Sequence, residues 1–83
     1  MRIDKFLKVS RLIKRRTVAN EAASAGRVKI NDKVVKPSEE VKVGDIVEIA
    51  FGQKSVKAEV LSIANTVRKE EANEMIRLIP GEE

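Results

Sequence analysis

The chain has 83 residues, enough for one small domain with a single hydrophobic core. It contains no cysteine and no histidine, which excludes a disulfide framework and thiolate metal sites and removes the commonest metal ligand and proton shuttle. The net charge of +4 and the pI near 9.6 fit a nucleic-acid partner, but also an anionic membrane surface or an acidic protein. We therefore expect no metal, no cofactor and no enzymatic activity.

The N-terminal segment does not resemble a secretory signal, because charged residues interrupt it every second or third position. No stretch approaches the roughly 20 apolar residues that a transmembrane helix needs. The basic start partly resembles a transit peptide, but it leads directly into core-forming residues and a helix. We expect a soluble, cytoplasmic protein.

Positive charge is concentrated at the N-terminus. The first 16 residues carry seven basic side chains and one acid, a net charge of +6, so the remainder of the chain sums to −2. The basic residues recur at helical spacing between apolar ones, so one face can pack while the other stays charged. This pattern predicts a polyanion-binding surface. Its candidate residues are Arg2, Lys5, Lys8, Arg11, Lys14, Arg15, Arg16 and Thr17.

Two helices are predicted in the first 26 residues. The first runs from Asp4 to about Val9, with Asp4 placed to cap it or to oppose its dipole. An irregular or helical turn follows, and a second helix is expected from an N-cap at Thr17 to the glycine at position 26. Its packing face is predicted to consist of small apolar residues: Val18, Ala22 and Ala25.

Arg15 and Arg16 directly precede this second helix, where its dipole disfavours positive charge. A bound phosphate would reverse that preference, because helix-start amides, the Thr17 hydroxyl and both guanidinium groups could converge on one anion. Alternatively, both arginines point into solvent and only increase solubility.

After the second helix the apolar period changes to two. Alternating residues over 28–34 predict a hairpin around the turn Asn31–Asp32. Further strands are predicted over 46–51 and 56–60, followed by a short polar helix over 66–75 and an extended segment over 76–79.

The predicted fold class is α+β, with two short N-terminal helices packed on a small twisted antiparallel sheet. The main domain is expected over 1–64, and 65–83 are expected to form a C-terminal extension with a short helix, a strand and an acidic tail. The core is expected to combine helical and strand residues: Phe6, Leu7, Leu12, Val18, Val28, Ile30 and Ile49.

The chain has only two aromatic residues, Phe6 and Phe51, and both fall in apolar patterns that predict core positions. A surface without aromatic platforms is expected to recognise the shape and charge of an RNA backbone, not individual bases. Lys29 and Lys36 lie in or beside the predicted hairpin. They either extend the basic face or are solvent-facing lysines that protect a sheet edge.

Several segments occur at the offsets typical of one RNA-binding family, the S-four or αL domain, which the chain resembles over about residues 1–50. The departure is Asp32, where the family usually has glycine after asparagine. The matching segments are Arg2 to Leu7, Arg11–Leu12, Arg15 to Thr17, Gly26 to Val28, Ile30–Asn31, Val41 and Gly44 to Ile46.

The small size, the motif FGQK at 51–54 and KEEANEM near the end make the chain similar to the RqcP family of ribosome-associated quality control proteins. It is also similar to the related small heat-shock ribosome-associated family. The first resemblance implies a protein that binds the obstructed large ribosomal subunit, contacts rRNA and P-site peptidyl-tRNA, and supports template-independent C-terminal tailing with the factor RqcH. We expect the protein to be a monomer. By this resemblance, Arg2 and Arg16 are the first candidates for RNA contact. The second family implies a heat-shock or assembly factor for large-subunit rRNA.

Overall fold

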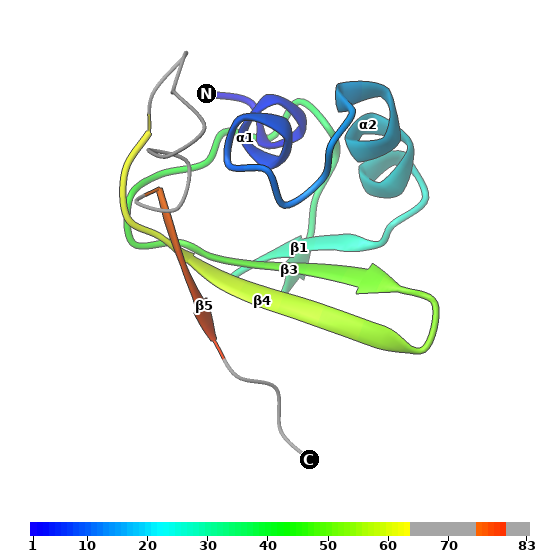
Figure 1. The fold of residues 1–83 in the computed structure, drawn as a ribbon. Helices are drawn as coiled ribbons and strands as arrows, with labels where there is room; N and C mark the ends of the chain where they lie inside the picture. Colours follow the sequence, from blue (N-terminus) through cyan, green and yellow to red (C-terminus); the bar gives the residue numbers. More distant parts are fainter. Residues whose placement is uncertain (64–74, 80–83) are drawn as a thin grey trace.

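The computed structural model describes residues 1–63 and 75–79. In this part of the chain, two helices lie on one face of a five-stranded antiparallel sheet (Figure 1). The predicted α+β class is confirmed. The helices are α1 (Ile3–Val9) and α2 (Arg16–Ser24). The strands, in the spatial order β2-β1-β3-β4-β5, are β1 (Val28–Ile30), β2 (Lys33–Val34), β3 (Ile46–Phe51), β4 (Lys54–Val60) and β5 (Ile76–Ile79).

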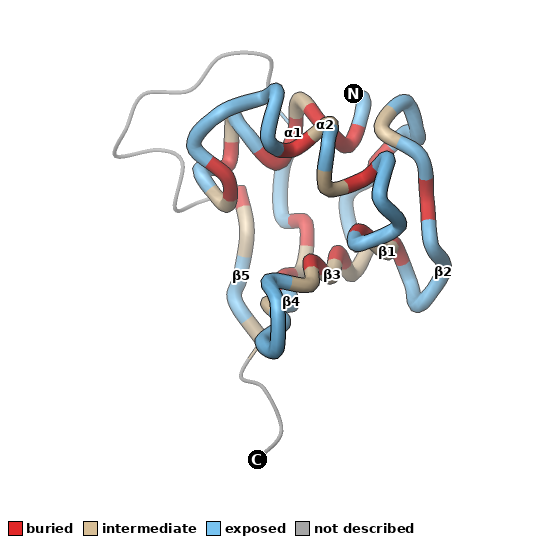
Figure 2. The backbone as a smooth tube through the Cα atoms, turned by 90° about the vertical axis from the view of Figure 1, so that its right-hand side faces the viewer, coloured by how far each residue is buried: buried red, intermediate tan, exposed pale blue. Residues whose placement is uncertain are grey.

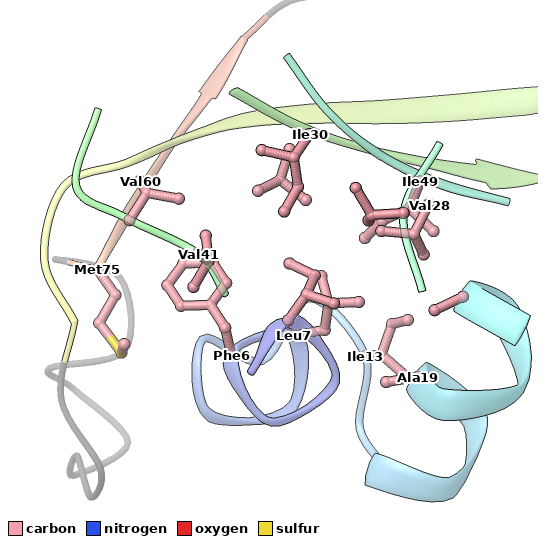
Figure 3. Packing of buried hydrophobic residues seen from close by; sticks show 14 residues of the cluster. Phe6, Leu7, Ile13, Ala19, Val28, Ile30, Val41, Ile49, Val60 and Met75 are labelled. Atoms are coloured by element: carbon pink, nitrogen blue, oxygen red, sulfur yellow. The ribbon is translucent and has the colours of Figure 1, made fainter. Parts of the chain in front are cut away.

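The core fills the space between the helices and the sheet. Figure 3 shows Phe6 and Leu7 pointing from α1 toward the strands, and both side chains are fully buried. Opposite them, the inward row of β3 and its neighbour β1 contributes Val47, Ile49 and Val28. Full burial of one such side chain stabilises the fold by about 1.5–3 kcal/mol. Buried stretches occur in both layers, and the connecting loops are mostly exposed apart from the buried core positions Ile13, Val35 and Val41 (Figure 2).

The predicted N-cap of α2 is wrong, and of its predicted packing face only Ala22 packs against the core, where it is partly buried. The helix begins at Arg16, and Arg15 takes the N-cap position without a side-chain capping bond, so Thr17 lies inside the first turn and does not cap it. The buried residues are Ala19 and Ala23, four positions apart. Val18 is 44% exposed and Ala25 is also exposed. The small apolar residues of α2 occupy adjacent faces, so sequence periodicity alone could not decide which of them meets the sheet.

The two helices end differently. Gly26 has a φ of +78°, and the amides of Gly26 and Arg27 donate to the carbonyls of Ala23 and Ala22, which is a Schellman motif at the predicted glycine. Arg11 occupies the equivalent position after α1 with a φ of +66°. A side chain is strained in this left-handed region, so α1 ends on an arginine where glycine would be easier.

The predicted hairpin turn is confirmed at Asn31–Asp32, where both residues have positive φ, at +53° and +68°. That combination is typical of a type I′ turn. The Asn31 side chain also anchors the turn to the start of β3, since Nδ2 donates to Oδ1 of Asp45 at 3.1 Å and Oδ1 accepts from the Ile46 amide at 3.0 Å.

Two further core predictions differ from the structure. Phe51 is 43% exposed, because it lies at the last position of β3 where the hairpin to β4 turns. Leu12 is only partly buried.

At the C-terminal end, the predicted strand over 76–79 is confirmed as β5, which pairs with β4. The predicted polar helix over 66–75 lies, except for Met75, outside the described residues.

Candidate nucleic-acid interface

A buried carboxylate joins the two helices at the basic end of the molecule. Asp4, in the first turn of α1, is 1% exposed. Its Oδ2 accepts from Nη2 of Arg2 at 3.1 Å and from Nδ2 of Asn20 at 3.2 Å. Its Oδ1 accepts from the Lys5 amide at 2.7 Å and from Nη2 of Arg16 at 3.5 Å. Both carboxylate oxygens therefore have partners, and one anion holds two arginines from different segments.

This arrangement resolves the unfavourable charge at the start of α2. A guanidinium at a helix N-terminus is repelled by the helix dipole. Here the Arg16 guanidinium faces the Asp4 carboxylate. Asn20, one helical turn after Arg16, donates a hydrogen bond to the same carboxylate. The buried acid thus stabilises the cation where the helix alone would not.

Burial raises the pKa of Asp4, but its partners outweigh that effect and the net pKa lies below its ordinary value. The lowering comes from the Asn20 hydrogen bond, the Arg16 charge, the Lys5 amide and the Arg2 charge. Asp4 is therefore ionised at neutral pH, and its role is to orient cations.

The two arginines remain available to a ligand. Their side chains are 46% and 47% exposed for Arg2 and Arg16 respectively, although each contacts the buried Asp4. They line an open groove of about 430 Å³ together with Asp4, Thr17, Asn20 and Glu21. A partly exposed guanidinium with one side held in place is suited to bidentate hydrogen bonding with a phosphate. We refer to this space as the arginine groove.

Three of the eight predicted N-terminal residues thus line one groove: Arg2, Arg16 and Thr17. The other five lie in α1 and in its connection to α2, outside the lining of the groove. Arg15 precedes the helix and is not part of the groove lining, so the predicted convergence of Arg15 with Arg16 is replaced by the pair Arg2 and Arg16. The five residues outside the groove are Lys5, Lys8, Arg11, Lys14 and Arg15.

Lys29 and Lys36 have different positions. Lys29 alternates along β1 with the buried Val28 and Ile30, so its side chain is on the sheet face away from the helices. It sits opposite Glu48 of β3 on that face. Lys36 is exposed in the loop after β2, which contacts the start of α1 through the Pro37 carbonyl and the Asp4 amide, 3.3 Å apart.

Sequence reasoning missed the organising roles of Asp4 and Asn20. One signal was present, since Asp4 stands among Ile3, Phe6 and Leu7 on the apolar side of α1, where an unpaired acid would be costly. Two of its partners, Arg16 and Asn20, lie 12 and 16 positions away, and helix periodicity carries no information about them.

Neither a metal site nor a membrane span is found in the described part of the chain. No group of three or more acidic residues there is arranged to hold a metal ion. Neither described helix has the length and apolar character needed to cross a bilayer.

Comparison with known proteins relates this geometry to a family. The S4 domain model matches residues 1–47, which include both helices and every residue of the arginine groove. The chain is 51% identical over 82 residues to the RQC P-site tRNA stabilizing factor of Bacillus subtilis, covering 99% of this chain and 95% of that protein. The chain belongs to this family of S4 domain proteins.

Other family members and solved structures agree with this assignment. The factor of the same name from Halalkalibacterium halodurans is 56% identical over 73 residues, covering 88% of this chain and 83% of that protein. The fold is similar to Vibrio cholerae Heat Shock Protein 15, a trimeric structure, with a TM-score of 0.87 and 28% identity over 95% of this chain and 81% of the other. The solution structure of the hypothetical protein HP1423 superposes with a TM-score of 0.82, at 32% identity over 99% of this chain and 100% of the other.

Proposed function

We propose that this chain is an RNA-binding ribosome-associated quality control factor that stabilises P-site tRNA on the obstructed large ribosomal subunit. In this role it contacts the peptidyl-tRNA and rRNA, works in the cytoplasm with a tailing factor of the RqcH type, and supports template-independent C-terminal tailing of stalled chains. The support is its membership of the family of RQC P-site tRNA stabilizing factors.

The observation that carries the proposal is the pair Arg2 and Arg16, held by the buried Asp4 at the rim of the arginine groove. Because the guanidinium groups are already oriented, little conformational entropy is lost when they bind phosphate. The flanking cations Lys8, Arg11 and Lys14 continue the positive surface, which suits a folded RNA backbone.

The proposed mechanism needs no bond-making by the protein. A rigid cationic surface that binds tRNA more tightly in one position shifts the tRNA population toward that position, by its differential affinity alone. We accordingly assign no catalytic residue, and peptide-bond formation during tailing is left to the ribosome.

A second candidate function is binding of large-subunit rRNA during heat shock or assembly. The observation that favours it is the TM-score of 0.87 to Vibrio cholerae Heat Shock Protein 15. Sucrose-gradient profiles separate the two candidates. A rescue factor sediments with mature large subunits that carry nascent chains, whereas an assembly factor follows immature precursors.

The decisive experiment measures binding to purified large subunits carrying peptidyl-tRNA. Arg2→Ala and Arg16→Ala should each weaken binding without unfolding the protein. Lys29→Ala is the matched control, because it removes one positive charge from the opposite face of the sheet. If the double variant Arg2→Ala/Arg16→Ala binds as tightly as the parent at physiological salt, the assignment of this surface is wrong.

A further inference from the structure

Another hollow in the described part of the chain lies beside α2, next to the arginine groove, and the two spaces share Glu21. It has a volume of about 310 Å³ and lies between α2 and the end of the β3–β4 hairpin. Figure 1 shows this hairpin reaching out beneath the connection from α2 to β1. Its lining is mostly apolar, and two of its large side chains, Val18 and Phe51, are 44% and 43% exposed. We refer to this space as the Phe51 hollow.

Phe51 is exposed because it lies at the end of the inward-facing row of β3. It follows Val47 and Ile49 on the inward face of β3, and these two are only 1% exposed. The hairpin extends beyond the helical layer, so the third member of the row presents its ring to the hollow. Phe51 and the exposed Val18 line the same hollow, so the ring belongs to a joint apolar surface and is not an isolated exposed side chain.

Two cations come from the segments around Phe51. Lys54 is the cross-strand partner of Phe51, so both side chains project from the same face of the hairpin end. Arg27 lines the hollow, and its backbone is fixed by the Schellman motif and by its carbonyl, which accepts from the Ala50 amide at 2.9 Å. Among the described residues, neither side chain forms an ion pair.

We propose that the Phe51 hollow binds an unpaired RNA base, which stacks on the Phe51 ring while Arg27 and Lys54 contact the adjoining phosphates. This inference rests on the proposed RNA-binding function and adds a second contact site to it. Base stacking needs only an exposed aromatic face and a cationic rim, and it tolerates any base.

The charge distribution favours a nucleotide over an apolar peptide as the occupant. An apolar peptide would leave the two cations without a partner, whereas a nucleotide offers a flat base for the ring and a phosphate for each cation. Glu21 lines both the Phe51 hollow and the arginine groove. Its carboxylate repels phosphate but accepts hydrogen bonds from base N–H groups. In the proposed complex Glu21 therefore faces the base, and the RNA backbone lies toward Arg27 and Lys54.

The test uses two stem-loop RNAs that differ only at one bulged position, which carries adenine in one and an abasic sugar in the other. Phe51→Ala and Phe51→Leu should each weaken binding of the adenine RNA by about tenfold and leave the abasic RNA unaffected. Phe51→Trp should retain affinity. Because the chain has no other tryptophan, the indole fluorescence should be quenched by the adenine RNA and not by the abasic one.

Leu78→Ala is the matched control, an exposed apolar residue, 61% exposed, on the edge strand β5. Circular dichroism of each variant establishes that it is folded. Equal affinity of Phe51→Ala and parent for the adenine RNA, or an equal loss for both RNAs, would overturn the proposal. So would a change in sedimentation of Phe51→Ala without a change in RNA affinity, which would identify the hollow as a protein–protein interface.

Arg16→Ala separates this inference from the proposed function. That variant should weaken binding of both RNAs equally, because it removes a phosphate contact. If Arg16→Ala weakens binding and Phe51→Ala does not, only the Phe51 hollow is refuted. If neither variant changes RNA affinity, the RNA-binding function itself fails.

Discussion

Asn20 of α2 donates a hydrogen bond of 3.2 Å to the carboxylate of Asp4 in α1, across 16 positions of sequence. The same carboxylate holds Arg2 and Arg16, so one buried anion links the docking of the two helices to the orientation of two cations. The geometry of the arginine groove therefore depends on the same contact that holds α1 against α2.

Asp4→Asn should lower the free energy of unfolding at neutral pH by about 1–3 kcal/mol, because two arginines lose their buried partner and the amide cannot accept at both positions. Urea unfolding followed by circular dichroism measures this change. Glu39→Gln, at an exposed loop position, is the control and should change stability by less than about 0.5 kcal/mol. Equal effects of the two substitutions would contradict a structural role for the Asp4 carboxylate.

Acidic pH should remove the contribution of the Asp4 carboxylate to the free energy of unfolding. The pKa of Asp4 is lower in the folded protein than the value of about 3.9 expected in the unfolded chain. The stabilisation is therefore fully present above about pH 4 and is lost as the pH falls through the folded-state pKa. The difference in unfolding free energy between the parent and Asp4→Asn, measured at pH 6, 4 and 3, should shrink toward the lowest pH. A difference that stays constant would show that the ionised form is not the stabilising one.

Substitution by alanine should destabilise the protein much more at Phe6 than at Phe51. Phe6 is fully buried and Phe51 is 43% exposed. Phe6→Ala should cost about 3–5 kcal/mol, which is a large part of the stability of a domain this small. Phe51→Ala should cost about 1 kcal/mol and leave the protein folded. Thermal and urea unfolding of both variants compares them directly, and similar losses would place Phe51 in the core after all.

The contrast between the two phenylalanines shows what the sequence could predict. Alternation along 46–51 correctly assigned the face of β3 on which Phe51 lies, and helical spacing correctly placed Phe6 and Leu7 in the core. Whether another element covers a given position is a tertiary property. Phe51 extends past the helices, so a local pattern could not reveal its exposure.

The same limit applies to the candidate site. The concentration of positive charge identified Arg2 and Arg16 correctly as members of one surface region, because local composition is sufficient for that. The contact between Arg16 and the Asp4 carboxylate is non-local, and so is the position of Lys29 on the opposite face of the sheet. For α2, the N-cap lies two residues earlier than predicted, at Arg15 instead of Thr17, and the buried face consists of Ala19 and Ala23.

Arg11 offers a test of whether strain is retained for function. Its φ of +66° is a conformation that glycine adopts readily. Arg11→Gly should raise the unfolding free energy by about 0.5–1 kcal/mol and weaken RNA binding through the lost charge. Arg11→Ala should weaken RNA binding equally without the gain in stability, because alanine keeps the strained backbone. If Arg11→Gly is no more stable than Arg11→Ala, the strain at this position is not significant.

Arg16→Lys separates charge from geometry at the arginine groove. Lysine keeps the positive charge but lacks the planar fork that contacts Asp4 on one side and presents further N–H groups on the other. RNA affinity should therefore fall several-fold in Arg16→Lys, while the slope of log affinity against log salt stays near that of the parent. Arg16→Ala should lower affinity further and make the slope shallower by about 0.7–0.9, the value for one lost phosphate contact. Titrations of one RNA at three salt concentrations measure both quantities. An Arg16→Lys variant with full affinity would mean that Asp4 does not need to orient this cation, and that charge alone explains binding.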